Sequence, residues 1–155
     1  MRVGICWNWE CCQVSPVKDH HCMNCGGLTE LGYRAQAIRE ARDDARLTQR
    51  QSAKLVHVSL RAWQSWEAAE RLAPLGALEL YKLKTDDPYR VLELPELPDG
   101  EILRGYRLSR GLSINECCDL LAVKYPTYWA WENRGAAMPL WAWELLHLKM
   151  GFSHP

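Results

Sequence analysis

Cysteine is concentrated near the N-terminus of this 155-residue chain, where neighbouring thiols could bind a metal ion. Five of the seven cysteines lie within the first 25 residues: Cys6, Cys11, Cys12, Cys22 and Cys25. Cys22 and Cys25 are separated by two residues and followed by two glycines, so both thiolates can reach one tetrahedral Zn²⁺ on a tight turn. We therefore predict a structural zinc site with Cys6, Cys11, Cys22 and Cys25 as ligands.

The ligand set stays open, because the first half of the site has no CxxC spacing. Cys12 could replace Cys11, and His20 or His21 could replace one thiolate. The alternatives to a metal site are reduced, partly buried cysteines or a disulfide in a secreted module. About 30 residues bury too little surface to fold alone, so zinc would supply the missing stability. Residues 1–30 are accordingly expected to form a zinc knuckle or ribbon.

The rest of the chain repeats itself with a period of 65 residues. Similar residues recur at this spacing: Leu47 and Leu112, Leu55 and Leu120, Val58 and Val123, Trp66 and Trp131, Glu67 and Glu132, and Pro74 and Pro139. Each copy must then be one structural unit built twice. Apolar residues at helical spacing and hydroxyl residues that can cap helices predict a helix, a short turn and a second helix in each copy.

The predicted fold class is therefore mostly α, with the zinc segment followed by two tandem helix-turn-helix domains. The first domain would span residues 31–87 and the second residues 101–155. The acidic, Pro-rich residues 88–100 would link them, because closely spaced prolines exclude a continuous helix and favour a stiff spacer.

The first copy contains a residue pattern typical of one family: Arg42, Leu47-Thr48-Gln49, Ala53, Val58-Ser59, Trp66-Glu67 and Pro74. Over about residues 34–85 it resembles the Cro/CI-type (XRE) repressors. Residues 58–67 look particularly like phage anti-CRISPR-associated regulators and the DNA-binding half of MqsA-like antitoxins. The resemblance implies a structural ion pair between Arg42 and Glu67. The repeat extends this pair to Arg107 and Glu132.

The resemblance also implies a DNA-binding surface. The third helix would lie in the major groove, and its base-facing residues would be Ser59, Leu60, Arg61 and Ser65. Arg61 matches the two acceptors of guanine, and Leu60 could contact a thymine methyl group. The predicted contacts to the DNA backbone are Thr48, Gln49, Arg50 and Gln64. Thr48 caps a helix whose N-terminal N–H groups can donate to a phosphate oxygen.

Other features of the first copy admit two interpretations. Arg39, Arg42, Arg46 and Arg50 form a basic stripe, which could instead be a solvated face balanced by Glu40, Asp43 and Asp44. His57 stands in the turn where the family usually has Gly. His tolerates positive φ better than β-branched residues do, and it could equally be a phosphate ligand. Trp63 and Trp66 are expected in the core.

The second copy keeps the fold pattern but loses the reading surface. Tyr125, Pro126 and Ala130 replace Leu60, Arg61 and Ser65 and cannot read guanine. Trp129, Trp141 and Trp143 are expected to add aromatic surface, which is typical of protein interfaces. Dimerisation or binding of a protein partner is favoured over DNA binding through Lys124, Tyr125, Thr127 and Tyr128. Cys117 and Cys118 are expected to be small core residues.

Composition limits the function. Nineteen basic and nineteen acidic residues give zero net charge, which argues against unspecific coating of a polyanion. No apolar run is long enough to span a bilayer and no signal-peptide core is present, so we expect a cytoplasmic protein without a membrane partner. Outside the zinc segment no catalytic constellation is evident, and His147 and His154 are expected on a helix surface and in the tail. An enzyme is not expected.

The favoured function is a sequence-specific transcriptional repressor, encoded by a phage or mobile element, that regulates its own operon. It would bind double-stranded operator DNA as a homodimer, with palindromic half-sites about 10 base pairs apart. The alternative is a protein-binding inhibitor or adaptor that uses the helix-turn-helix folds as a scaffold. Its partner would bind the zinc segment or the Trp-rich second copy.

Overall fold

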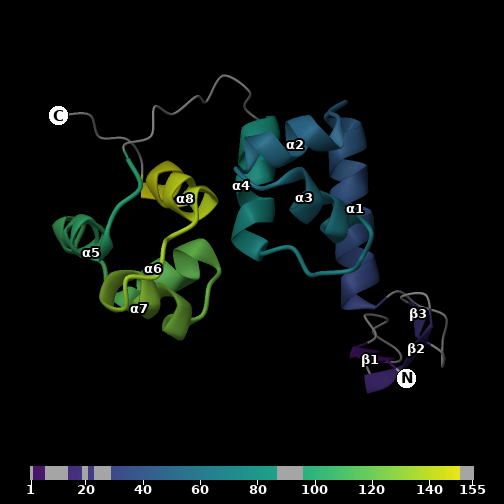
Figure 1. Cartoon of the computed structure of the whole chain (residues 1–155), viewed down its shortest axis with the longest axis horizontal. Helices are drawn as coiled ribbons and strands as arrows, with labels where there is room; N and C mark the ends of the chain where they lie inside the picture. Colours follow the sequence, from purple (N-terminus) through teal and green to yellow (C-terminus); the bar gives the residue numbers. More distant parts are fainter. Residues whose placement is uncertain (1, 6–13, 19–20, 23–28, 87–95, 151–155) are drawn as a thin grey trace. The chain divides into compact units, whose positions relative to one another are not determined.

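The computed structural model describes residues 2–5, 14–18, 21–22, 29–86 and 96–150 of the chain (Figure 1). Within these ranges the fold is mostly α-helical, which confirms the prediction at that level. Three short N-terminal strands, β1 (Arg2–Ile5), β2 (Val14–Lys18) and β3 (His21–Cys22), form an antiparallel sheet in the order β1-β2-β3. Val17 of β2 pairs with Arg2 on one side and with Cys22 on the other.

Eight helices make up the rest of the described chain. In the first copy these are α1 (Glu30–Asp44), α2 (Gln49–Leu55), α3 (Leu60–Glu67) and α4 (Leu75–Asp86). In the second copy they are α5 (Gly100–Ser109), α6 (Ile114–Leu121), α7 (Tyr125–Asn133) and α8 (Leu140–Met150). Each helix of the first copy thus has a counterpart 65 residues later, as the repeat predicts.

Short polar residues begin several of these helices by binding the first free amide groups. The hydroxyl of Thr29 accepts a hydrogen bond from the Gly32 N–H at the start of α1, and the Ser59 hydroxyl accepts one from the Ala62 N–H at the start of α3. Ser113 and Glu116 form a reciprocal capping box at the start of α6. The predicted cap at Ser59 is confirmed.

The chain divides into two compact units, which do not coincide with the two copies. The first unit comprises Met1–Lys54 and Val58–Ala73, and the second comprises Leu55–His57 and Pro74–Pro155. Helix α4, which the sequence analysis assigned to the first domain, therefore belongs with α5 to α8. Residues Leu55–His57, which lead into the turn before α3, also belong to the second unit.

The first unit has a small aromatic core. Ala35 and Ile38 of α1 and Ala53 of α2 are buried together with Trp63 and Trp66 of α3. The two indole rings lie 5.8 Å apart between centroids in a tilted arrangement. Burial of Trp63 and Trp66 confirms the prediction that they are core residues.

In the second unit α8 is the central helix. It packs against α4 and α6, and every residue from Trp141 to Leu148 is buried. The approach of α4 is so close that a Cβ added to Gly76 would lie 2.4 Å from the Leu121 carbonyl oxygen and 2.5 Å from the Trp141 ring. Gly76 is therefore required by packing.

This arrangement corrects two expectations. Trp141 and Trp143 do not add aromatic surface, because a helix with no polar face is enclosed on all sides. His147 is buried instead of lying on a helix surface, and its Nδ1 lies 2.9 Å from the Trp143 carbonyl oxygen. The expected burial of Cys117 and Cys118 is confirmed.

The two inter-helix turns have the same unusual backbone. His57 adopts φ +55° and its counterpart Ala122 adopts φ +51°, in the left-handed region that favours glycine. The prediction that His57 can occupy this turn is confirmed. None of the helices in the described ranges has the length and apolar character needed to cross a lipid bilayer.

Candidate nucleic-acid interface

The first turn of α3 presents most of the predicted base-contacting residues to solvent. Ser59 and Arg61 are exposed, and Leu60 is half-buried. Ser65 differs, because it is buried and its hydroxyl donates to the Ala62 carbonyl oxygen at 2.8 Å. The accessible set therefore consists of Ser59, Leu60 and Arg61, and Ser65 belongs to the interior of the first unit.

A buried carboxylate, Glu67, anchors the end of α3. Its Oε1 accepts hydrogen bonds from Arg42 Nε at 2.7 Å and from Trp63 Nε1 at 2.6 Å, and its Oε2 accepts one from Gln49 Nε2 at 2.7 Å. The backbone carbonyl of the same residue accepts a hydrogen bond from Arg39 at 2.5 Å. The implied ion pair between Arg42 and Glu67 is confirmed.

These bonds have an electrostatic consequence. Burial alone would raise the pKa of Glu67, but the hydrogen bonds from Arg42, Gln49 and Trp63 outweigh it and hold the pKa below its ordinary value. The carboxylate is therefore ionised at neutral pH and binds donors from α1, α2 and α3 together. It fixes the position from which the first turn of α3 projects.

The predicted contacts to the DNA backbone fall into two groups. Gln49 and Gln64 join α2 to α3, since Gln64 Nε2 donates to Gln49 Oε1 at 3.3 Å. The Thr48 hydroxyl oxygen accepts a hydrogen bond from the Gln51 N–H at 3.3 Å, and the Thr48 N–H donates to Gln51 Oε1 at 2.9 Å, so the helix end predicted to bind a phosphate is already capped. Arg50 is exposed on α2.

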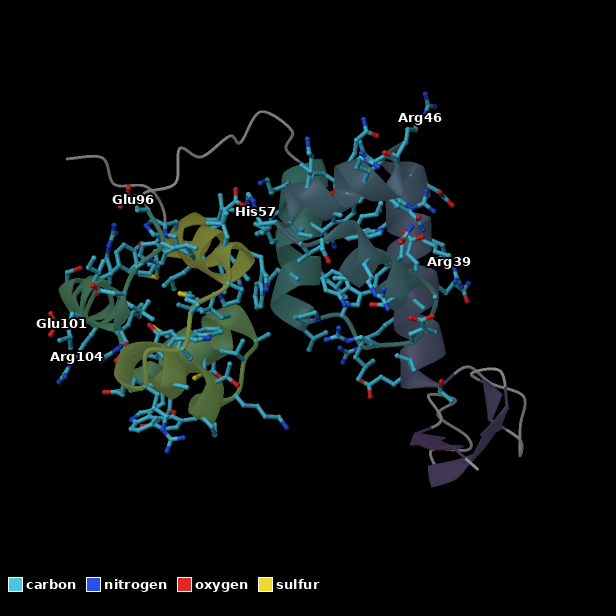
Figure 2. All side chains as sticks on the ribbon, in the orientation of Figure 1. Arg39, Arg46, His57, Glu96, Glu101 and Arg104 are labelled. Carbon is cyan, nitrogen blue, oxygen red and sulfur yellow. The ribbon has the colours of Figure 1, made fainter. Side chains whose placement is uncertain are left out.

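The arginine stripe is partly structural. Arg42 binds Glu67 and also Asp43, at 2.7 Å, and Arg39 donates to the end of α3. Arg46 and Arg50 are exposed, and Figure 2 shows Arg46 extending away from the first unit. The stripe therefore contributes both to the fold and to a basic surface.

The second copy repeats the ion pair without the polar network. Arg107 Nε lies 2.7 Å from Glu132 Oε1, and Arg107 Nη2 lies 3.1 Å from Oε2, which confirms the predicted pair. The counterparts of Gln49 and Trp63 are Ile114 and Tyr128. Tyr128 is fully buried, so it cannot contact DNA as the weaker alternative required.

The surface of α6 and α7 also differs from that of α2 and α3. Glu116 and Asp119 are exposed on α6, and Tyr125 is exposed at the start of α7. Trp129 is half-exposed, with the guanidinium of Arg134 5.1 Å from its ring centroid. Among the described residues of this copy, α7 therefore carries an exposed and a half-exposed aromatic ring.

His57 is bound within a charged cluster in the second unit. Its Nε2 lies 2.8 Å from Glu144 Oε2, and Lys84 Nζ lies 2.8 and 2.9 Å from the two oxygens of the same carboxylate. Burial would raise the pKa of Glu144, but the bonds from His57 and Lys84 outweigh it and lower the pKa. The His57 ring is therefore engaged by a carboxylate, which argues against its alternative role as a phosphate ligand.

Lys84 and Glu144 were not predicted from the sequence. The available signal was a single carboxylate in the run from Trp141 to Leu148, whose other residues are apolar apart from His147. A carboxylate in such a position must be paired with a cation or hydrogen-bonded to be tolerated. Its partners come from 87 and 60 residues away, and no local pattern identifies them.

Most of the predicted zinc site lies outside the residues that the structure describes. Cys6, Cys11 and Cys25, together with the alternatives Cys12 and His20, lie outside the described residues, and the backbone of Cys22 ends β3. Among the described residues, no group of three or more His, Cys, Asp or Glu side chains could hold a metal ion. The zinc site stays a prediction.

Comparison of the chain with protein-family models, with curated proteins and with solved structures finds no match. The resemblance to Cro/CI-type repressors therefore stays a hypothesis that rests on the residues quoted for it.

Proposed function

We propose that this chain binds double-stranded DNA sequence-specifically, with the first turn of α3 in the major groove, and acts as a transcriptional repressor. One observation carries the proposal. Apart from His57, the charged residues between positions 48 and 66 are Arg50, Lys54 and Arg61, and all three are exposed. A surface with cations and no carboxylate suits the phosphate backbone, which dominates affinity for DNA.

Arg61 is the residue we propose for base recognition. It is exposed in the first turn of a helix, and its guanidinium can donate two hydrogen bonds to guanine in the major groove. Leu60, which is half-buried beside it, offers an apolar contact for a thymine methyl group. The network around Glu67 supports this role, because it holds α3 in a fixed orientation before DNA arrives.

The second copy provides an internal comparison. Helix α6 has exposed Glu116 and Asp119 at the positions that Gln51 and Lys54 occupy on α2. If the second copy docked on DNA in the same way, these carboxylates would face phosphate groups and repel them. DNA binding is therefore assigned to the first copy alone.

The proposal includes the other expected components. The N-terminal cysteines supply a set of thiolate donors that suits structural Zn²⁺, which would stabilise residues 1–30. The chain would bind an inverted repeat as a homodimer and regulate its own operon on a phage or mobile element. These components follow from the sequence and from the resemblance.

The test is selection from random duplex DNA by the zinc-loaded full-length protein, followed by titration of the selected sequence at two salt concentrations. We expect a palindromic sequence and an affinity that falls with salt. Arg61→Ala should weaken binding by about 1–3 kcal/mol and relax the preference at one base position. Absence of enrichment would refute the proposal.

Lys124→Ala is the matched control for Arg61→Ala. Lys124 is an exposed cation that precedes α7, the counterpart of α3, and its loss should leave DNA affinity unchanged. Equal effects of the two substitutions would contradict the assignment of DNA binding to the first copy.

A second candidate function is an adaptor that binds a protein partner. The exposed ring of Tyr125 and the half-exposed ring of Trp129 on α7 favour it, because aromatic residues are enriched in protein interfaces. Co-purification of one protein that resists high salt, together with no selected DNA sequence, would support this function over the first.

A further inference from the structure

The turn between α2 and α3 is bound by a helix of the other copy. Residues Leu55–His57 belong to the second unit, although most of α2 and all of α3 belong to the first. Within this turn His57 adopts φ +55°, and the Val58 N–H that follows donates to the Ala53 carbonyl oxygen at 3.0 Å. Because the turn sets the angle between α2 and α3, a contact that holds the turn also acts on the helix proposed to read DNA.

The contact that holds the turn is made by Glu144 of α8. His57 Nε2 lies 2.8 Å from Glu144 Oε2, so the labelled ring in Figure 2 reaches α8. The Glu144 side chain is 3% exposed and that of His57 is 27% exposed. An ionised carboxylate only accepts hydrogen bonds, so Nε2 carries the proton and donates it. Hydrogen bonds to an ionised group shielded from water are among the strong ones.

The repeat provides an internal comparison for this contact. Lys84 of α4 pairs with Glu144 of α8 at 2.8 Å, and Lys149 of α8 pairs with Glu79 of α4 at 2.6 Å. Each residue of the second pair lies 65 positions from its counterpart in the first, so the ion pairs between α4 and α8 are reciprocal. The two turns differ, because the counterpart of the turn histidine is Ala122, whose side chain cannot bind a carboxylate.

We propose that Glu144 is a positioning residue for DNA binding: by holding His57 it fixes the turn between α2 and α3, so that α8 of the second copy sets how tightly the first copy binds DNA. The inference deepens the proposed function and rests on it for the DNA-binding step. It gives the second copy, which the proposed function leaves without a DNA contact, the role of regulating the first.

The backbone of the turn explains why a clamp would matter. A left-handed conformation is unfavourable for a residue other than glycine, so a turn released from α8 would populate other conformations. Each of these changes the direction of α3 relative to α2. Affinity falls in proportion to the fraction of molecules that remain competent to bind. Loss of the contact with Glu144 therefore weakens DNA binding without removing any group that touches DNA.

Amide hydrogen exchange, read by NMR on the zinc-loaded full-length protein, tests the clamp without DNA. His57→Ala and Glu144→Gln should each speed exchange of the Val58 amide about fivefold or more relative to the Trp63 amide inside α3. Alanine suits this turn, since Ala122 adopts φ +51° at the equivalent position. Unchanged relative exchange of Val58 in both variants would overturn the proposal.

Titration of the selected DNA sequence and of an unrelated duplex, at two salt concentrations, tests the effect on DNA binding. His57→Ala and Glu144→Gln should each weaken binding of the selected sequence about fivefold or more. Affinity for the unrelated duplex and the dependence on salt should stay as in the wild type. A direct phosphate contact from His57 would instead weaken both duplexes and lower the salt slope by about 1, which would overturn the positioning role.

A double-mutant cycle and a matched control separate positioning from general destabilisation. H57A/E144Q should bind the selected sequence no more weakly than the weaker single variant, because both substitutions remove the same bond. Additive losses would contradict the proposal. Glu79→Gln is the control, since it removes the equivalent carboxylate of α4 and should leave DNA affinity unchanged. If Glu79→Gln and Glu144→Gln weakened DNA binding equally, the positioning role would be excluded.

The two measurements distinguish this inference from the proposed function. If the wild type selects no DNA sequence but both variants speed exchange at Val58, the proposed function fails and the clamp on the turn stands. If the wild type binds a selected sequence and both variants bind it equally well, the inference alone fails.

Discussion

Glu67→Gln is the most direct test of how the first three helices are held together. The substitution keeps the size of the side chain and removes its charge. One of the two oxygens becomes an NH₂ group, so it faces the Gln49 donor or the Trp63 donor instead of accepting from it. Arg42 Nε lies 2.7 Å from Glu67 Oε1 in the wild type, and in the variant it has at most a neutral amide oxygen as its acceptor.

The expected cost follows from burial. Removing one member of a buried ion pair destabilises a protein by about 3–5 kcal/mol. The Glu67 side chain is 6% exposed, but that of Arg42 is 19% exposed, so water can compensate part of the loss. We therefore expect about 3 kcal/mol, near the low end of that range, which is a large part of the 5–15 kcal/mol typical of a whole domain.

Native-state hydrogen exchange read by mass spectrometry can localise this cost. A loss of about 3 kcal/mol corresponds to roughly hundredfold faster exchange for amides of α1–α3 that exchange when the helices open together. Glu132→Gln is the matched control, because it removes the equivalent carboxylate and should accelerate exchange in α5–α7. Unchanged exchange of α1–α3 in Glu67→Gln, or equal acceleration of both regions by both variants, would refute the reasoning.

Two further predictions concern the turns and the buried carboxylates. Ala122→Gly should stabilise the protein by about 1 kcal/mol, because it relieves a left-handed backbone, and a thermal midpoint that does not rise would contradict this. His57→Gly relieves the same backbone but removes the bond to Glu144, so its thermal midpoint should fall below that of Ala122→Gly. The pKa values of Glu67 and Glu144 are lowered by folding, so their stabilisation is complete above the ordinary value of 4.5 and is lost as the pH falls through the folded values. Urea midpoints should thus fall in acid, and less steeply in a variant with both residues changed to Gln.

The repeat made much of the fold predictable. Once the 65-residue period is recognised, each helix and each inter-helix turn in one copy predicts its counterpart in the other. The ion pair Arg42–Glu67 was predictable from the resemblance to Cro/CI-type repressors, and the repeat extended it to Arg107–Glu132. Caps such as Ser59 were predictable because they depend on residues only three positions apart.

The surroundings of α8 could not be predicted position by position. Trp141 and Trp143 were expected at the surface because each was considered alone. A run of apolar residues without a polar face indicates instead a helix enclosed on all sides. The contact between His57 and Glu144 was beyond sequence reasoning, since it depends on how segments far apart in the chain pack.

The way the two copies differ supports one DNA contact in each chain. The two copies have similar residues at equivalent buried positions. Both keep the arginine–glutamate pair, and both have a small residue at the position of Ala53 and Cys118. Their exposed residues disagree, with Lys54 on α2 replaced by Asp119 on α6. If only the first copy reads DNA, as we propose, one chain cannot by itself occupy both halves of a palindrome. Binding of a palindromic operator would therefore require two chains, and a selected site that binds only one chain would exclude the homodimer.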